Sequence, residues 1–342
     1  MKLSWKWTLN DLNQVQKNGR KVFSCFSCGG GSSMGYKLAG FDVIGNCEID
    51  DQMNKLYVQN HHPKYNFKMD IRKFKNLPAE QIPEELFNLD ILDGSPPCSS
   101  FSLAGVREDA WGKTKVFREG QAAQTLDDLF FEFINVAERL QPKVIIAENV
   151  KGLIVGNAKG YLNEILKRLR EIDYVPQLFL LNSAFMGVPQ RRERVFVIAR
   201  RSDVPKNKLK LIFNETPITF GEIKSATGKC LNTNTKTYWY WKQRIQSDRN
   251  LGDISKRIYG KEKGFTNSIL HDEQVAPTLT ANGTLLRYSE PYLLSDMDMI
   301  HMQSFPEDYD FMEQSVQYVC GMSVPPVMMA RIAKQIYIQW FQ

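Results

Sequence analysis

The sequence predicts an α/β fold with a doubly wound, mostly parallel sheet and a smaller, basic second domain. Through the first two hundred residues, short apolar segments alternate with helix-like segments. This alternation is typical of parallel sheets that carry helices on both faces. It stops between about residues 202 and 285, which are polar and basic, and a helix-like segment returns near the carboxyl terminus. We therefore expect one sheet-based body with a second region added to it.

The elements of the body are predicted from hydrophobic periodicity and turn residues. The predicted strands are residues 21–26, 42–47, 66–69, 89–92 and 144–147. The predicted helices are residues 33–39, 50–60, 125–140, 161–170 and 324–340. Two prolines, Pro325 and Pro326, enter the last helix, and the first can sit near the helix start.

The composition indicates an ordinary globular protein. The chain has 342 residues, of which 43% are hydrophobic and 24% charged. It shows neither a signal-peptide pattern nor an apolar run long enough to span a membrane. The six cysteines are scattered, and the Cys25–Cys28 pair has no second pair at metal spacing, so we expect no zinc site. Reduced thiols favour a cytoplasmic protein.

Positive charge is concentrated in the second region. The net charge of the chain is +6, and residues 200–275 carry 15 Lys and Arg against 8 Asp and Glu, so the rest is close to neutral. This predicts a local surface for a polyanion, although a solvated Lys-rich surface would give the same bias. We expect a body formed by residues 1–200 and 285–342, and a second domain formed by residues 201–284.

A glycine-rich turn, CGGGSSMG at residues 28–35, separates the first predicted strand from a helix. Glycines let a nucleotide-like ligand approach the backbone, and the helix N-terminus supplies donors. The spacing does not match the dinucleotide fingerprint, which argues against a nicotinamide-dependent oxidoreductase. Glu48 ends the next predicted strand, where it could accept both hydroxyls of a ribose, and Asp70 could reach an adenine amino group. These residues favour an adenosine-containing cofactor; the alternative is a structural turn.

Cys98 stands just after another predicted strand, in DGSPPCSSFS at residues 93–102. Pro96 and Pro97 fix φ and stiffen the approach to the thiol. The carboxyl end of a strand is where α/β folds place their sites. An accessible, partly ionised thiol there could act as a nucleophile. The alternative from this stretch alone is a buried, inert cysteine.

Three further polar residues are predicted at the same edge. AENV puts Glu148 at the end of a buried strand, where it could protonate a ring nitrogen or simply cap a helix. In PQRRERVFVIAR, Arg192 and Arg194 alternate and should project to one face. Arginines in a cleft can bind a base carbonyl, a phosphate or the acid itself.

The motifs FSCFSCGGGSSMG, DGSPPCSSFS, AENV, QRRERVFVIA and CGMSVPP stand in the order found in DNA (cytosine-5) methyltransferases. The chain resembles this family from about residue 22 to residue 336. The resemblance implies S-adenosylmethionine as cofactor and a cytosine flipped out of duplex DNA as substrate. Cys98 would add to C6 of the base, Glu148 would contact N3 and the exocyclic amine, and Arg194, with Arg192 beside it, would hold O2. C5 would then take the methyl group.

The resemblance also implies binding residues. Residues 103–124 resemble the mobile loop that closes over DNA, residues 201–284 resemble the variable target-recognition domain, and APTLT at 276–280 resembles its boundary. Phe26 resembles the ring that packs on the adenine. The cofactor-binding residues implied are Phe26, Gly29, Gly30, Gly31, Glu48, Ile49, Asp70, Ile71, Pro97 and Ser323, and the DNA-binding residues are Ser102, Gln190, Tyr238, Trp239, Lys242 and Arg244. The aromatic run at 237–241 could equally form the small hydrophobic core of the domain.

The sequence departs from the family at three positions. Ser24 replaces an acidic residue, Cys28 a glycine and Met322 an asparagine, which affects the expected cofactor contacts more than the reaction. Two alternatives remain: a cytosine-5 methyltransferase acting on transfer RNA, and a catalytically silent DNA-binding relative. The size of the basic region favours duplex DNA, and intact Cys98, Glu148 and Arg194 favour catalysis. We expect a monomer that protects DNA beside a separate restriction endonuclease.

Overall fold

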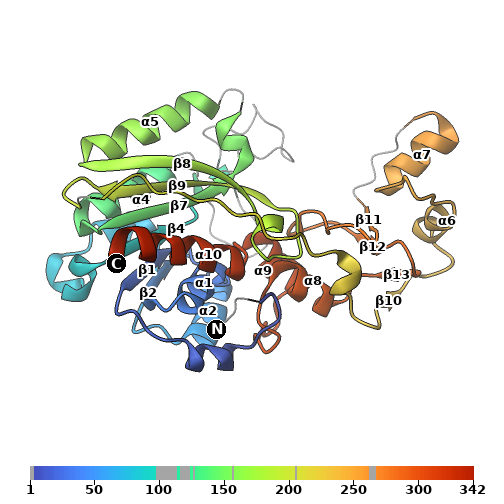
Figure 1. Cartoon of the computed structure of the whole chain (residues 1–342), viewed down its shortest axis with the longest axis horizontal. Coiled ribbons are helices and arrows are strands. Elements are labelled where there is room, and N and C mark those ends of the chain that lie inside the picture. The colour runs from blue at the N-terminus through green and yellow to red at the C-terminus, as the bar shows by residue number, and fades with distance from the viewer. Residues whose placement is uncertain are drawn as a thin grey trace.

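The computed structural model describes residues 4–97, 128–155, 158–204, 206–261 and 267–342, together with the backbone of residues 114–115 and 124–125. They form a large lobe that contains both termini of the described chain and a small lobe beside it (Figure 1). Within the described residues, none of the helices is both long and apolar enough to span a membrane.

The large lobe is built on a seven-stranded sheet of order β3-β2-β1-β4-β7-β9-β8. The first five of these strands run parallel, and β9 is antiparallel to both β7 and β8. This confirms the mostly parallel, doubly wound sheet. The strands are β1 (Lys21–Cys25), β2 (Asp42–Glu48), β3 (Tyr65–Lys68), β4 (Ile91–Gly94), β7 (Val144–Val150), β8 (Tyr174–Asn182) and β9 (Glu193–Arg201).

Helices cover both faces of the sheet, as Figure 1 shows. Alternate strand residues point to opposite faces, so Phe23 of β1 and Leu92 of β4 join one core whereas Val22 and Ile91 join the other. One face is covered by α3 (Ile71–Lys75), α4 (Leu129–Leu140) and α5 (Ala158–Glu171), and the other by α1 (Gly31–Leu38) and α10 (Pro326–Ile336). The lobe is completed by α2 (Asp51–His61), α8 (Asp296–Gln303) and α9 (Val316–Met322).

Some boundaries differ from the sequence-based prediction. The helix predicted from residue 125 begins at Leu129, because Thr125 belongs to β6 (Gln124–Thr125), which pairs with β5 (Thr114–Lys115). The last helix begins at Pro326 after the extended Pro325 and continues from Tyr337 as a π-helical turn. Leu89 precedes β4 as the cap of a 3-10 turn, so the strand runs two residues further towards Cys98 than predicted.

The small lobe has its own sheet and core. Its sheet has the order β10-β13-β12-β11, formed by β10 (Lys229–Cys230), β11 (Ser268–Leu270), β12 (Leu285–Arg287) and β13 (Tyr292–Leu293). Two helices, α6 (Lys236–Lys242) and α7 (Leu251–Tyr259), pack on it. The sheet extends beyond the predicted boundary at residue 284, whereas Leu209 still packs in the core of the large lobe.

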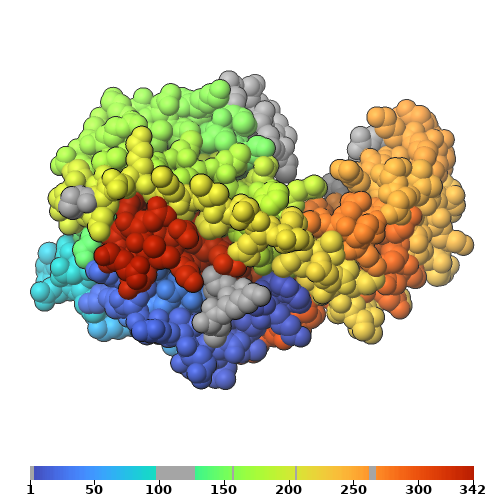
Figure 2. All heavy atoms as spheres, viewed as in Figure 1, coloured from blue at the N-terminus to red at the C-terminus, as the bar shows by residue number. Residues whose placement is uncertain are grey.

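A buried ion pair joins the lobes. Arg287 of β12 donates to the Asp298 carboxylate of α8 at 2.6 Å, and both side chains are buried. Breaking such a pair leaves an uncompensated charge and costs about 3–5 kcal/mol, so the contact fixes the small lobe against the large one. Figure 2 shows a deep notch between the two lobes.

Candidate active site

The candidate site lies at the carboxyl edge of the parallel strands. Parallel strands end at the same edge of a sheet, and this edge is where ligands bind in open α/β folds. The ends of β1, β2, β4 and β7 carry Phe26, Glu48, the segment leading to Cys98, and Glu148. Because β9 runs antiparallel, its first residues, including Arg194, begin at this same edge.

Glu148 and Arg194 form an ion pair at this edge. Glu148 lies opposite Phe196, two residues from Arg194, so the two side chains are diagonal neighbours on one face. The Arg194 Nε lies 2.9 Å from the Glu148 Oε1, and the side chains are 15% and 12% exposed. Burial lowers the pKa of the Arg194 guanidinium, and the Glu148 carboxylate opposes this shift. The pair therefore lies at the rim of the sheet edge, with a small part of each side chain exposed.

Asn149 connects the acid's strand to the segment that precedes the cysteine. Its Nδ2 donates to the Pro96 carbonyl at 3.1 Å, and the side chain is buried. Pro96 and Pro97 are held beside the end of β7 by this bond. Cys98 and Ser102 lie outside the described residues, as does most of the segment 103–124. The sequence showed Asn149 at the strand end but gave no sign of its partner.

Arg192 is placed differently from Arg194. Its guanidinium donates to the carbonyls of Leu279 (2.9 Å), Gly321 (2.8 Å) and Ser323 (3.1 Å), and the residue is 2% exposed. Burial and the neighbouring Arg194 lower the pKa of Arg192. These bonds give Arg192 a structural role, tying the start of β9 to the end of α9.

The glycine-rich turn has an unusual backbone. Phe26, Cys28 and Gly30 have φ values of 53°, 44° and 75°. A left-handed conformation costs a non-glycine residue about 1–2 kcal/mol, so Cys28 holds a strained backbone that glycine would adopt more easily. The Cys28 N–H donates to the Glu48 Oε2, and the Asp50 N–H to its Oε1, both at 2.9 Å. Burial raises the pKa of Glu48 and these bonds oppose the shift.

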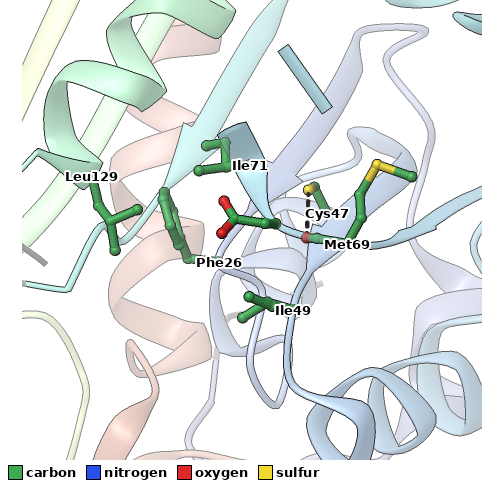
Figure 3. Close-up of a pocket in the computed structure, with 7 residues that line it drawn as sticks. Phe26, Cys47, Ile49, Met69, Ile71 and Leu129 are labelled. Carbon is green, nitrogen blue, oxygen red and sulfur yellow. Dashed lines mark hydrogen bonds between the residues drawn. The ribbon is translucent and has the colours of Figure 1, made fainter. Parts of the chain in front are cut away.

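A pocket opens beside this turn (Figure 3). It is lined by Phe26, Cys47, Ile49, Met69, Asp70, Ile71 and Leu129 and is partly open to solvent. The side chains of Phe26, Ile49 and Ile71 point towards one another across it. Asp70 also caps α3 and lies 3.3 Å from Arg72. Flat apolar walls with one carboxylate suit an adenine ring that carries an amino group.

Residues distant in the sequence support the turn. The Tyr309 hydroxyl donates to the Gly29 carbonyl at 2.7 Å, and His61 lies beneath Gly30. The Cβ of Ser323 lies against Gly31, and its hydroxyl donates to the Val319 carbonyl at 2.7 Å. Met322 is 43% exposed and takes no part in this packing. No short spacing could have indicated Tyr309, which is 280 residues from Gly29.

The predicted DNA-binding residues divide into buried and exposed groups. Gln190 is fully buried, where its amide bonds Leu279, Met302 and Gln303. Tyr240 and Trp241 belong to the core of the small lobe, as the alternative interpretation of the run 237–241 expected.

The guanidinium of Arg244 lies over the Trp241 ring and donates to the Tyr288 carbonyl at 2.7 Å. Trp239 is 44% exposed, Lys242 is exposed, and Tyr238 is half-buried. No cluster of metal-ligating side chains occurs among the described residues.

Comparison with known proteins identifies the family. A sequence profile of the C-5 cytosine-specific DNA methylases matches residues 20–338. The chain is 36% identical over 187 residues to the Type II methyltransferase M.FnuDI of Fusobacterium nucleatum, covering 54% of this chain and 48% of that protein. It is 34% identical over 190 residues to M.NgoPII of Neisseria gonorrhoeae, covering 55% and 50%. The chain thus spans about half the length of these curated relatives.

A solved structure shows the same fold. A prophage-encoded protein of E. coli is 21% identical and has a TM-score of 0.69 over 95% of this chain and 100% of that one. The match of the family profile covers the sheet edge with Glu148 and Arg194 as well as the glycine-rich turn. The chain therefore belongs to the C-5 cytosine-specific DNA methylase family.

Proposed function

We propose that this protein transfers a methyl group from S-adenosylmethionine to C5 of a cytosine flipped out of duplex DNA. The observation that carries the proposal is the Glu148–Arg194 pair, 2.9 Å apart at the edge where β4 leads to Cys98. Binding of DNA alone does not require a carboxylate at this edge, whereas addition to a pyrimidine ring requires both a nucleophile and a group that polarises the ring.

Cys98, Glu148 and Arg194 have separate roles in the proposed reaction. The Cys98 thiolate forms a bond to C6, while Glu148 contacts N3 and the exocyclic amine so that the ring accepts the electron pair. Arg194 orients Glu148 and holds O2. C5 becomes nucleophilic as a result, and S-adenosylmethionine supplies the electrophilic methyl group. Transfer of the C5 proton to a base and departure of the thiolate from C6 then restore the aromatic ring.

The pocket at the glycine-rich turn fits the adenosine part of the cofactor. Phe26, Ile49 and Ile71 offer apolar contacts to the ring, and Asp70 offers an acceptor for its amino group. Glu48 accepts bonds from the backbone N–H groups of Cys28, Ile49 and Asp50, and its carboxylate still has a lone pair for a ribose hydroxyl. Gly29, Gly30, Gly31, Pro97 and Ser323 complete the proposed contact surface.

The notch between the lobes is the proposed DNA site. Residues 229–293, which contain the sheet and helices of the small lobe, carry 10 Lys and Arg against 6 Asp and Glu, and Trp239 and Lys242 are exposed on α6. Lysines at such a surface contact phosphates, and exposed aromatic rings can contact bases. A cognate restriction endonuclease is the proposed partner in the cell, acting separately from a monomeric methyltransferase. For the domains we propose the predicted division into 1–200, 201–284 and 285–342, with the second boundary moved from 284 to the end of β13 at Leu293.

One experiment tests the reaction. The purified protein is incubated with mixed-sequence duplex DNA and methyl-labelled S-adenosylmethionine, and the labelled base is mapped. We expect 5-methylcytosine within one short motif, abolished in Cys98→Ser and reduced at least about a hundredfold in Glu148→Gln. Cys230→Ser is the matched control, because Cys230 is an exposed thiol on the small lobe. Label on transfer RNA but not on DNA would overturn the DNA substrate, and full activity in Cys98→Ser would overturn the mechanism.

A further inference from the structure

A buried carboxylate sits between the cofactor turn and the strand that leads to Cys98. Asp93 of β4 is the register partner of Ser24 of β1, and the two side chains are both 2% exposed. The Ser24 hydroxyl donates to the Asp93 Oδ2 at 2.9 Å. The acid of β4 is thus bonded directly across the strand pair to β1.

The Asp93 carboxylate also holds the first helix. The Tyr36 hydroxyl donates to its Oδ1 at 3.1 Å, and the Ser32 side chain hydrogen-bonds the same carboxylate. Both residues belong to α1, which starts at Gly31 directly after the glycine-rich turn. One carboxylate therefore joins β1, β4 and α1, the three elements that carry the turn and the approach to Cys98.

The location is costly for an acid, which argues that it is retained for a purpose. Burial raises the pKa of Asp93 to about 7, the bonds from Ser24 and Tyr36 oppose the shift, and the Glu148 carboxylate adds to it. A neutral side chain could fill this space without a desolvation penalty. The residues on this face of β1, β4, β7 and β9 form a polar row towards the sheet edge: Ser24, Asp93, Glu148 and Arg194.

We propose that Asp93 is a positioning residue whose buried carboxylate links β1, β4 and α1, and so holds the cofactor turn against the strand that leads to Cys98. The inference rests on the proposed function, since it assigns the turn to S-adenosylmethionine. The same three hydrogen bonds could form with the acid on either β1 or β4. Positions 24 and 93 are register partners on these two strands, so a carboxylate at either position would lie between them.

Relocating the acid tests this. Asp93→Ser leaves two serines, and the double variant Ser24→Asp/Asp93→Ser moves the carboxylate to β1 without changing the composition of the pair. The affinity for S-adenosylmethionine is measured by calorimetry without DNA, and kcat and KM are measured with DNA. We expect Asp93→Ser to weaken cofactor affinity and raise KM for the cofactor by at least about tenfold, with a smaller effect on kcat. The double variant should return both values to within about threefold of the wild type.

A double variant that binds the cofactor no more tightly than Asp93→Ser would overturn the proposal, as would wild-type cofactor affinity in Asp93→Ser. If Asp93→Ser fails to fold, the double variant is compared with Asp93→Asn, which keeps the shape and lacks the charge. Cofactor affinity close to the wild-type value in the double variant, but weakened in Asp93→Asn, supports the proposal. Affinity close to the wild-type value in Asp93→Asn, but weakened in the double variant, overturns it. The calorimetric measurement of cofactor affinity needs no nucleic acid. If the wild-type protein failed to methylate DNA, that result would count against the proposed function, and the calorimetric test of Asp93 could still be made.

Discussion

The glycine-rich turn permits a quantitative prediction, because Gly30 has a matched control elsewhere in the chain. Gly30 has φ +75°, and a Cβ placed there would lie 1.9 Å from the His61 Nε2. Gly260 has φ +71° at the end of α7, and no atom of the described residues lies within 4 Å of its Cβ position. Substitution by alanine costs both sites the same backbone penalty, about 1–2 kcal/mol. Only Gly30 adds a steric collision.

The size of the collision term follows from the surroundings of His61. The ring stacks on Tyr57 at a centroid distance of 4.2 Å and lies in the interior, so it cannot turn aside into solvent. Overpacking of this kind costs about 1–3 kcal/mol. We therefore expect Gly260→Ala to lower the free energy of unfolding by about 1–2 kcal/mol and Gly30→Ala by about 2–5 kcal/mol.

The assay is urea denaturation of both variants, with calorimetry of S-adenosylmethionine binding. Gly30→Ala should also weaken cofactor binding, whereas Gly260→Ala should not. In a cycle with His61→Ala, which removes the ring, the collision term should disappear and give a favourable coupling of about 1–3 kcal/mol. Equal losses at the two glycines, or no coupling with His61, would refute the reasoning.

Three further predictions concern buried and exposed positions. Arg192→Met should lower the free energy of unfolding by about 3–5 kcal/mol in urea titrations, because three carbonyls lose their donor. Arg194→Met should instead abolish methyl transfer, with a smaller loss in the free energy of unfolding. The opposite pattern would contradict a structural role for Arg192 and a catalytic role for Arg194. Because the pKa of Asp93 is raised to about 7, the folded state binds its proton more tightly than the unfolded state does. The stability of the wild type relative to Asp93→Asn should therefore fall from about pH 4 to pH 7, by up to about 4 kcal/mol, and a flat difference would contradict the burial of a titrating acid. Gly160→Ala in α5 should raise the melting temperature slightly, by the equivalent of about 0.5–1 kcal/mol, since no atom of the part of the chain that the structure describes lies within 4 Å of its Cβ position. A lower melting temperature would contradict the packing of α5.

The order of the elements in the large lobe could be predicted from the sequence because its signals are local. Apolar runs such as Val144–Ile146 are long enough to identify a strand buried on both faces. The polar residues at their ends, Glu148 among them, follow directly along the chain. The gathering of these ends at one edge is a consequence of parallel topology, so the site region was predictable as well.

Long-range contacts could not be predicted in the same way. Arg192 and Arg194 alternate in the sequence, yet Arg192 is tied to carbonyls 87 to 131 residues away. Gln190 looks like a surface amide, but its partners come from residues near 279 and 303. In α6, four aromatic residues follow one another at positions 238–241, so no polar alternation within the run revealed that Trp241 is buried and Trp239 exposed.

The central claim, that Cys98 attacks cytosine at this sheet edge, can be tested most directly by trapping the adduct. Mixed-sequence duplex DNA is synthesised with 5-fluorocytosine in place of cytosine and incubated with the protein and S-adenosylmethionine. Fluorine at C5 cannot leave as a proton does, so a bond between the thiol and C6 should persist. We predict a complex that survives denaturation, with the nucleotide attached to the peptide that contains Cys98. Attachment to any other residue, or no complex under conditions in which ordinary DNA is methylated, would contradict the account.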